Sequence, residues 1–279
     1  MNSSFVSDQP LSYFCSTSQA RFFITVGFAA VKALLLLPLS ILVLHLGLQR
    51  WRQQRSFNSV SHSDVFTYHL AAMELFWAPG LVCYLCGDHF RNATAAYAGL
   101  LAFSVTFYGE FFFHSFTCVD RYLAVVHPII YLRLKNVAGI RIRNISIASV
   151  WLFCLVIMRF ETDVSGNNAI VFMLSSLGAF LMVVTFCNFS VLCALIRPGP
   201  GEGVIKIDPL KQRAFNTITA ISCVLWLWFV ALIVTSALSQ SPLLSEDVGC
   251  ILLAVASWFN LPASLVSPLL YLHRTRKVR

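Results

Sequence analysis

Seven long runs of mostly apolar residues are the feature that most constrains the fold of this chain. They lie at about 22–49, 65–87, 96–122, 145–162, 168–196, 212–238 and 249–272. A helix of about 20 residues crosses the ~30 Å hydrocarbon core of a bilayer. Only 11% of the residues are charged, whereas soluble domains carry about 25%. The sequence therefore predicts an all-α fold, a seven-transmembrane helix bundle.

The distribution of basic residues predicts the orientation of this bundle. Sixteen of the twenty Lys and Arg residues lie in or beside the first, third and fifth connectors or in the C-terminal tail. Cytoplasmic connectors carry the excess of Lys and Arg, so we expect the N-terminus outside and the C-terminus in the cytoplasm. The expected parts are an extracellular segment (1–21), a seven-transmembrane domain (22–272) and a short basic cytoplasmic tail (273–279).

The net charge of +8 follows from this topology and from attraction to the anionic lipids of the inner leaflet. Membrane lipids are therefore expected partners, and nucleic acid is not. The sequence contains no metal cluster and no nucleophile constellation, so we do not expect an enzyme.

Two features suggest modification on the outer side. The sequons that begin at Asn2 and Asn92 both fall on predicted outer segments, where the acceptor asparagine can be glycosylated. Cys15 and Cys250 are the cysteines expected to meet an oxidising space, and a disulfide between them is one pairing, with Cys86 as a competing partner.

The third span carries a polar stripe. Glu110, His114, Thr117 and Arg121 are spaced by four, three and four residues, so they share one helix face. Polar groups inside a membrane face the bundle interior, and an ionisable one there marks a functional site by default. The alternative is that Glu110 is protonated and only hydrogen-bonds to a neighbouring helix.

The seventh and first spans also contain polar residues. Asn260, Ser264, Ser267 and Tyr271 form a second stripe with the same spacing in the seventh span. Lys32 in the first span stands alone on its helix. We expect its side chain to snorkel to the outer membrane interface.

The end of the third span contains the most specific sequence motif of the chain. Asp120-Arg121-Tyr122 is followed by Leu-Ala-Val-Val-His127-Pro128. Leu-Ala-Ala-Met-Glu74 in the second span, Trp151 in the fourth and Ser267-Pro-Leu-Leu-Tyr271 in the seventh add to it. Together with seven spans and an outer N-terminus, these motifs resemble the class A, rhodopsin-like G-protein-coupled receptors over essentially the whole chain.

The resemblance implies roles for matching residues at the inner side. Asp120 would hold Arg121 at rest, Arg121 would contact a heterotrimeric G protein after activation, and Tyr271 would swing inward to hold the active state. Asp208 falls where some receptors place an acid that restrains the arginine, although an N-cap before Pro209 also explains it. The implied location is the plasma membrane.

The chain also departs from the family pattern. Glu74 stands where the family usually has Asp, Glu110 where it has a small polar residue, and Ser267 where it has Asn. Ala96 occupies the position of the usual extracellular cysteine. Two facing carboxylates in mid-membrane cannot both ionise cheaply, so we hypothesise that Glu74 and Glu110 share a proton or bind a sodium ion, with His114 as a relay. No other cofactor is expected.

The outer halves of three spans supply a candidate ligand pocket that is aromatic and mostly neutral. Its members are Tyr97, Phe103, Trp226, Trp228, Trp258 and Asn260, and the resemblance places Trp226 beneath the ligand. The pocket suits a small apolar or uncharged ligand whose identity the sequence does not give. The alternative is that these aromatic residues pack between helices or form an interfacial belt.

Two other functions compete with a receptor. The buried Glu74, Glu110 and His114 would also suit a proton- or cation-conducting membrane protein. A degenerate receptor that no longer couples is the remaining alternative.

Overall fold

The computed structural model describes residues 19–54, 61–163, 167–196, 209–239, 241 and 244–276, and these residues are helical apart from short turns. The helices are α2 (Gln19–Gln54), α3 (His62–His89), α4 (Ala93–Val126), α5 (Pro128–Leu134), α6 (Val137–Asp163), α7 (Asn167–Ile196), α8 (Pro209–Ser239), α9 (Glu246–Ser257) and α10 (Asn260–Arg276). Within this described part, seven segments are long and apolar enough to cross a membrane, and α9 and α10 together form the seventh. The predicted fold class and spans are confirmed, and the orientation stays a prediction.

The seventh span is broken at Trp258 and Phe259, close to Pro262, one of two prolines that predict a kink in this span. Trp258 N–H and Phe259 N–H donate to carbonyls three residues earlier, at 3.1 Å each. Pro262 has no N–H to donate to the Trp258 carbonyl four residues earlier, and this carbonyl accepts instead from Leu261 N–H at 3.2 Å. The break places Asn260 at the first position of α10.

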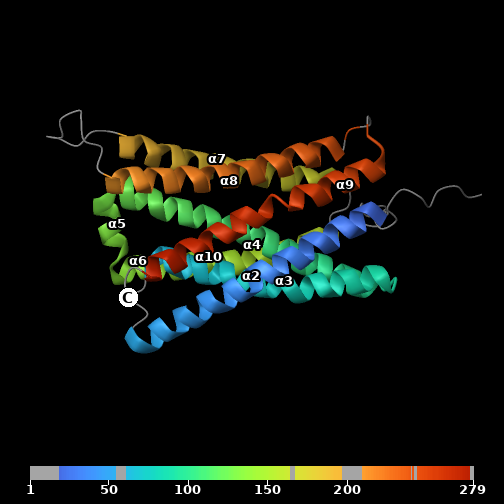
Figure 1. Cartoon of the computed structure of the whole chain (residues 1–279), viewed down its shortest axis with the longest axis horizontal. Helices are drawn as coiled ribbons and strands as arrows, with labels where there is room; N and C mark the ends of the chain where they lie inside the picture. Colours follow the sequence, from blue (N-terminus) through green and yellow to red (C-terminus); the bar gives the residue numbers. More distant parts are fainter. Residues whose placement is uncertain are drawn as a thin grey trace, which may run out of the picture.

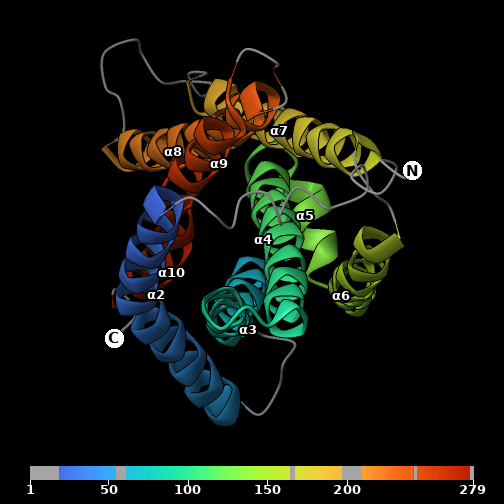
Figure 2. The same cartoon turned by 90° about the vertical axis from the view of Figure 1, so that its right-hand side faces the viewer.

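Helix α4 occupies the centre of the bundle (Figure 2). It packs against α3, α5, α6 and α7, and two apolar clusters form on its sides. One joins α4 to α3 and α6. The other joins it to α7, α8 and α10, where the ring of Phe111 stacks on Trp228 at 4.6 Å between centroids. Because α4 is surrounded in this way, its polar stripe has no route to lipid. Glu110, His114 and Thr117 are buried, as the stripe predicts.

The C-terminal half of α3 and the N-terminal half of α4 lie close together because glycines line their contact. A Cβ atom added at Gly80 would lie 2.5 Å from the Cβ of Ala102, and one at Gly87 or Gly99 would overlap the backbone of the opposite helix. Small residues allow helices in a membrane to approach in this way. At Gly87 the facing backbone includes Ala96. Close helix packing therefore joins α3 and α4 at this point.

Helix α5 lies across one end of the bundle (Figure 1). The His62 ring bonds to the Leu134 carbonyl at 2.9 Å, which fastens the end of α5 to the start of α3. Arg274 of α10 forms a 3.6 Å ion pair with Asp64 of α3. These contacts bring α3, α5 and α10 together at the end that the basic residues predict to be cytoplasmic.

Candidate functional site

A buried ion cluster joins three helices in the middle of the bundle. Lys32 Nζ of α2 lies 3.1 Å from Glu74 Oε2 of α3 and 3.3 Å from Glu110 Oε1 of α4. Lys32 donates a hydrogen bond to Glu110, while the Glu74 contact is an ion pair without hydrogen-bond geometry. The two carboxylates share one ammonium, which offsets the cost of burying charges in a medium of low dielectric constant.

The expectation that Lys32 snorkels to the outer interface is wrong. Only 2% of Lys32 is exposed, and its side chain turns toward Glu74 and Glu110. Snorkelling is the default for a basic residue with no partner, and both partners lie on other helices. The sequence does contain a signal for these partners. Lys32, Glu74 and Glu110 lie at similar numbers of residues from the helix ends that are predicted to be outside, so they are expected at similar depths in the membrane.

Aromatic rings cover the outer side of the ammonium. Lys32 Nζ lies 4.4 Å from the centroid of the buried Trp77 ring, a distance at which a cation is attracted to the face of an indole. Phe28, one turn before Lys32 on α2, meets Trp77 edge to face at 6.1 Å. Among the described residues, the polar contacts of the ammonium are therefore the two carboxylates.

The cluster extends to the seventh span through Asn260. Its Nδ2 donates to Glu110 Oε2 at 3.0 Å, and the Ser264 hydroxyl donates to its Oδ1. The break between α9 and α10 places Asn260 level with Glu110. Four helices, α2, α3, α4 and α10, therefore converge on the two carboxylates.

His114 and Ser267 lie below the cluster, toward the inner end. His114 is one turn from Glu110 on α4, and its ring meets Trp228 edge to face at 6.0 Å. Ser264 and Ser267 are both buried on α10. The structure thus brings the sequence-predicted Glu74, Glu110, His114 and Ser264 around one region, and it adds Lys32 and Asn260.

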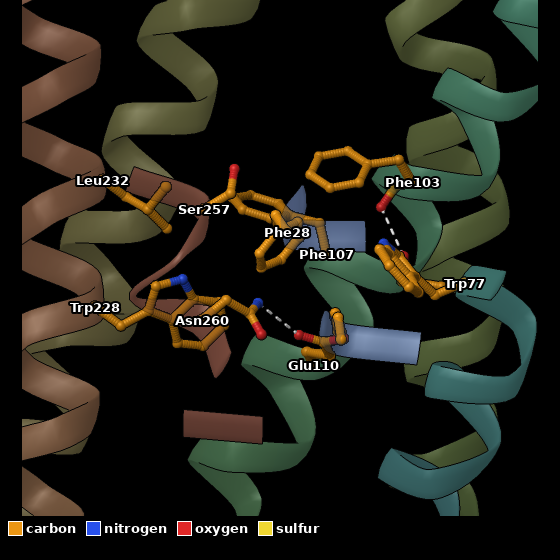
Figure 3. Close-up of a pocket in the computed structure, with 11 residues that line it drawn as sticks. Phe28, Trp77, Phe103, Phe107, Glu110, Trp228, Leu232, Ser257 and Asn260 are labelled. Atoms are coloured by element: carbon orange, nitrogen blue, oxygen red, sulfur yellow. Dashed lines mark hydrogen bonds and ion pairs between the residues drawn. The ribbon is translucent and has the colours of Figure 1, made fainter. Parts of the chain in front are cut away.

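A cavity of about 30 Å³ lies above Glu110, and the side chains around it are mainly aromatic (Figure 3). Its lining includes Phe28, Trp77, Phe103, Phe107, Trp228 and Asn260. A space of this size holds about two water molecules, whereas pockets for organic ligands measure about 300 to 1,000 Å³. An organic ligand therefore requires the surrounding helices to move apart.

Three of the aromatic residues assigned to the pocket lie outside this cavity. Trp226 is 46% exposed on the outer face of α8, where its indole N–H donates to Thr185 of α7 at 2.9 Å. Trp228, two residues later on α8, lines the cavity. Tyr97 is exposed, and Trp258 packs edge to face on Phe28 at 6.0 Å without lining the cavity.

The Asp120-Arg121-Tyr122 motif lies in the last turns of α4. Within the described part of the chain, no ion pair within 4.0 Å joins Asp120 to Arg121, because consecutive residues on a helix point in different directions. Both side chains are half-buried. The Tyr122 hydroxyl bonds to His127 Nε2 at 3.0 Å.

Tyr271 is fully buried in the C-terminal half of α10. Its hydroxyl lies 3.0 Å from that of Tyr68 on α3, and the Arg50 guanidinium of α2 lies 5.5 Å from its ring centroid. Tyr271 therefore connects three helices. Asp208, the other residue assigned to this end, lies outside the described residues.

The residues for which modification on the outer side is predicted are only partly described. Asn92 is exposed and caps α4, with its side-chain oxygen accepting from Ala95 N–H at 3.2 Å. Cys250 is in a disulfide and Cys86 is a free thiol. Cys15 and Asn2 lie outside the described residues, so the Cys15–Cys250 pairing and glycosylation stay predictions.

Searches among known proteins add no family assignment. No protein-family model matches the chain, and no curated protein does. The functional argument therefore depends on the residues and their geometry.

Proposed function

We propose that this multi-pass membrane protein is a G-protein-coupled receptor of the plasma membrane. The observation that carries the proposal is the position of Asp120-Arg121-Tyr122 at the inner end of α4, the third and central helix of seven apolar spans. In the resemblance, this arginine contacts the α subunit of a heterotrimeric G protein. Arg121 stands next to the surface on which a cytoplasmic partner would dock.

The helix that follows the motif supports a docking partner. In α5, Ile129 is 72% and Leu132 62% exposed, and no residue of this helix is buried. Apolar side chains that lie together on a protein surface mark a contact with another protein or with lipid. At the inner end of the third span, they would present an apolar surface beside Arg121.

Tyr131 is partly buried against α3, and this contact holds α5 in place. The Tyr131 ring meets His62 of α3 edge to face at 6.4 Å, and loss of solvent raises the pKa of the Tyr131 phenol above its usual value. The phenol therefore stays neutral at physiological pH. We expect α5 to keep its place while its apolar residues contact the partner.

The cavity above Glu110 is the proposed site from which a ligand acts. Its aromatic lining suits a small apolar or uncharged molecule. A ligand that separates Phe103, on α4, from Leu232, on α8, would enlarge the cavity and favour one of two helix arrangements. Movement of α8 relative to α4 would then reach the inner end.

The test is nucleotide exchange on a panel of heterotrimeric G proteins, measured in membranes that contain the full chain. Arg121→Ala should lower basal or ligand-evoked exchange at least about tenfold, a change of about 1.4 kcal/mol. Arg133→Ala removes an exposed charge on α5 and should have a much smaller effect. Equal exchange for wild type and Arg121→Ala would contradict the proposal.

The buried ion cluster favours one alternative, a proton- or cation-conducting protein. Charged residues in the interior of membrane bundles line ion pathways as well as structural sites. Ion flux into liposomes that contain the purified protein, without nucleotide exchange in the membrane assay, would favour conduction. Loss of both activities would favour a degenerate receptor that does not couple.

A further inference from the structure

Three buried polar atoms of Glu74 and His114 have no hydrogen-bond partner among the described residues. Glu74 Oε2 has its ion pair with Lys32, which leaves Glu74 Oε1 on α3 and His114 Nε2 on α4. Each residue is only 4% exposed. A buried polar atom without a partner is costly, and its presence in a folded protein indicates an additional group such as water. The two atoms belong to facing helices, so one group could satisfy both.

A second cavity lies where these residues meet. Its volume is about 10 Å³, and its lining is Leu70, Ala71, Glu74, Glu110, His114, Ser264 and Pro268. This is close to the smallest space that holds one water molecule. Glu74, His114 and the Ser264 hydroxyl would give that water the two to four polar partners that a buried water needs. The polar side of the cavity and its size both fit a single water.

The net charge of the ion cluster indicates that it binds a proton in addition to the water. Two carboxylates, Glu74 and Glu110, face one ammonium, Lys32. If both carboxylates ionise and His114 is neutral, the cluster has one uncompensated negative charge in a medium of low dielectric constant, which is unfavourable. One bound proton removes this charge.

The surrounding elements supply no second cation close to the cluster. In the described part, the charged or titratable groups that act on Glu74 or His114 are Lys32 from α2, and Glu110 and Arg121 from α4. Arg121 is two helical turns below His114. From α8 and α10 the nearest groups are the neutral Trp228, Asn260 and Ser264.

A metal cation fits this cavity less well than a proton does. It would lie beside Glu74, whose other carboxylate oxygen is 3.1 Å from the Lys32 ammonium, and two positive charges at such separations repel strongly in a protein interior. Among the described residues, no three His, Cys, Asp or Glu side chains could hold a metal ion. Protonation of Glu74 neutralises the charge without adding a separate cation.

We propose that Glu74 and His114 form a proton-binding site, linked by one water in the cavity between α3 and α4. With the proton bound, Glu74 Oε1 carries it and donates to the water, which in turn donates to His114 Nε2. When the proton leaves to solvent, the Glu74 carboxylate accepts from the water and the cluster gains one negative charge. Lys32 then balances two carboxylates alone.

The proton-binding site does not depend on coupling to a G protein. It sets a direction for pH dependence, because the neutral cluster is favoured at low pH and the charged cluster at high pH. The bound proton therefore stabilises the contact of α2 and α4 with α3, and deprotonation weakens it. A receptor and a conducting protein would both contain this site.

The test is infrared difference spectroscopy of the purified full chain in lipid nanodiscs, between acidic and alkaline buffer. The wild type should show the carbonyl band of a protonated carboxylic acid at low pH, and the band should disappear as pH rises. It should be absent from Glu74→Gln and present at a shifted frequency in Glu74→Asp, which keeps an acid at this position. Thermal unfolding of each variant shows that it is folded.

Two further measurements test the role of His114 and distinguish a bound proton from a bound sodium ion. His114→Asn should move the pH at which the band disappears by about one unit or more, because it removes the partner across the water. Exchange of choline chloride for sodium chloride at constant pH should leave the band unchanged. A band that is lost in Glu110→Gln but kept in Glu74→Gln, a band removed by sodium, or no band at any pH would overturn the proposal.

Discussion

The ammonium of Lys32 lies 3.1 Å from a carboxylate oxygen of Glu74, and both side chains are buried in the middle of the bundle. Lys32 also contacts Glu110 at 3.3 Å. One residue of the first span thus holds the acids of the second and third spans together. The stability of the bundle should depend on this single cation.

Replacement of Lys32 by methionine keeps the apolar length of the side chain and removes its charge. Glu74 and Glu110 then lose their ammonium, and we expect a loss of about 3 kcal/mol of unfolding free energy. The measurement is thermal unfolding of the purified protein in detergent. The double variant Lys32→Met/Glu74→Gln should recover part of the loss, since it removes one of the two unpaired carboxylates.

Arg274→Gln is the matched comparison for this prediction. It breaks the ion pair with Asp64, in which the Arg274 side chain is half exposed. Solvent screens such a pair, so the loss should stay below about 1 kcal/mol. Equal unfolding temperatures for Lys32→Met and wild type would contradict a stabilising role of the buried cluster.

Gly99 should be intolerant of even one added methyl group. Its Cβ would overlap the backbone of Tyr84 and the Gly80 carbonyl, so Gly99→Ala must separate α3 from α4, at a cost of about 1 to 3 kcal/mol. Gly178→Ala is the control, because nothing lies within 4 Å of the added Cβ. The control should be neutral or gain up to about 1 kcal/mol from helix propensity. The measurement is unfolding of both variants in detergent. Equal changes in unfolding free energy for Gly99→Ala and Gly178→Ala would contradict the prediction that the close contact of α3 and α4 excludes a methyl group.

The hydroxyl groups of Tyr68 and Tyr271 should be energetically coupled. They lie 3.0 Å apart, and a net hydrogen bond of this kind contributes about 1 kcal/mol. A double-mutant cycle with Tyr68→Phe, Tyr271→Phe and the double variant measures the coupling through unfolding temperatures. Strict additivity of the two single effects would argue against the hydrogen bond.

Asn92 should have two separable roles. Thr94→Ala removes the sequon and leaves the N-cap, so it should abolish glycosylation at Asn92 with little effect on stability. Asn92→Ala removes both, and loss of the cap should cost about a further 1 kcal/mol. Endoglycosidase sensitivity of the expressed protein and unfolding of the deglycosylated forms provide the measurements. The comparison is made in an Asn2→Gln background, which removes the other predicted sequon. A mobility shift in that background that persists with Thr94→Ala would contradict glycosylation at Asn92.

Most of the fold follows from local properties of the sequence. The seven spans depend on runs of apolar residues, and the buried faces of α4 and α10 depend on polar residues repeated at helical spacing. Each of these two signals can be read from a single segment of the sequence, without knowledge of the other segments. The sequence therefore gives the spans, and it predicts that Glu110, His114 and Ser264 face inward.

The tertiary structure decided which of these residues meet. Lys32 has no partner on its own helix, and only the packing of α2 beside α3 and α4 places two carboxylates at its depth. The rotation of α8 likewise decided that Trp228 faces the cavity and Trp226 faces outward. Hydropathy and spacing do not contain the relative depth and rotation of separate helices. Side-chain packing between the helices sets them, and it brought Lys32, Glu74 and Glu110 together.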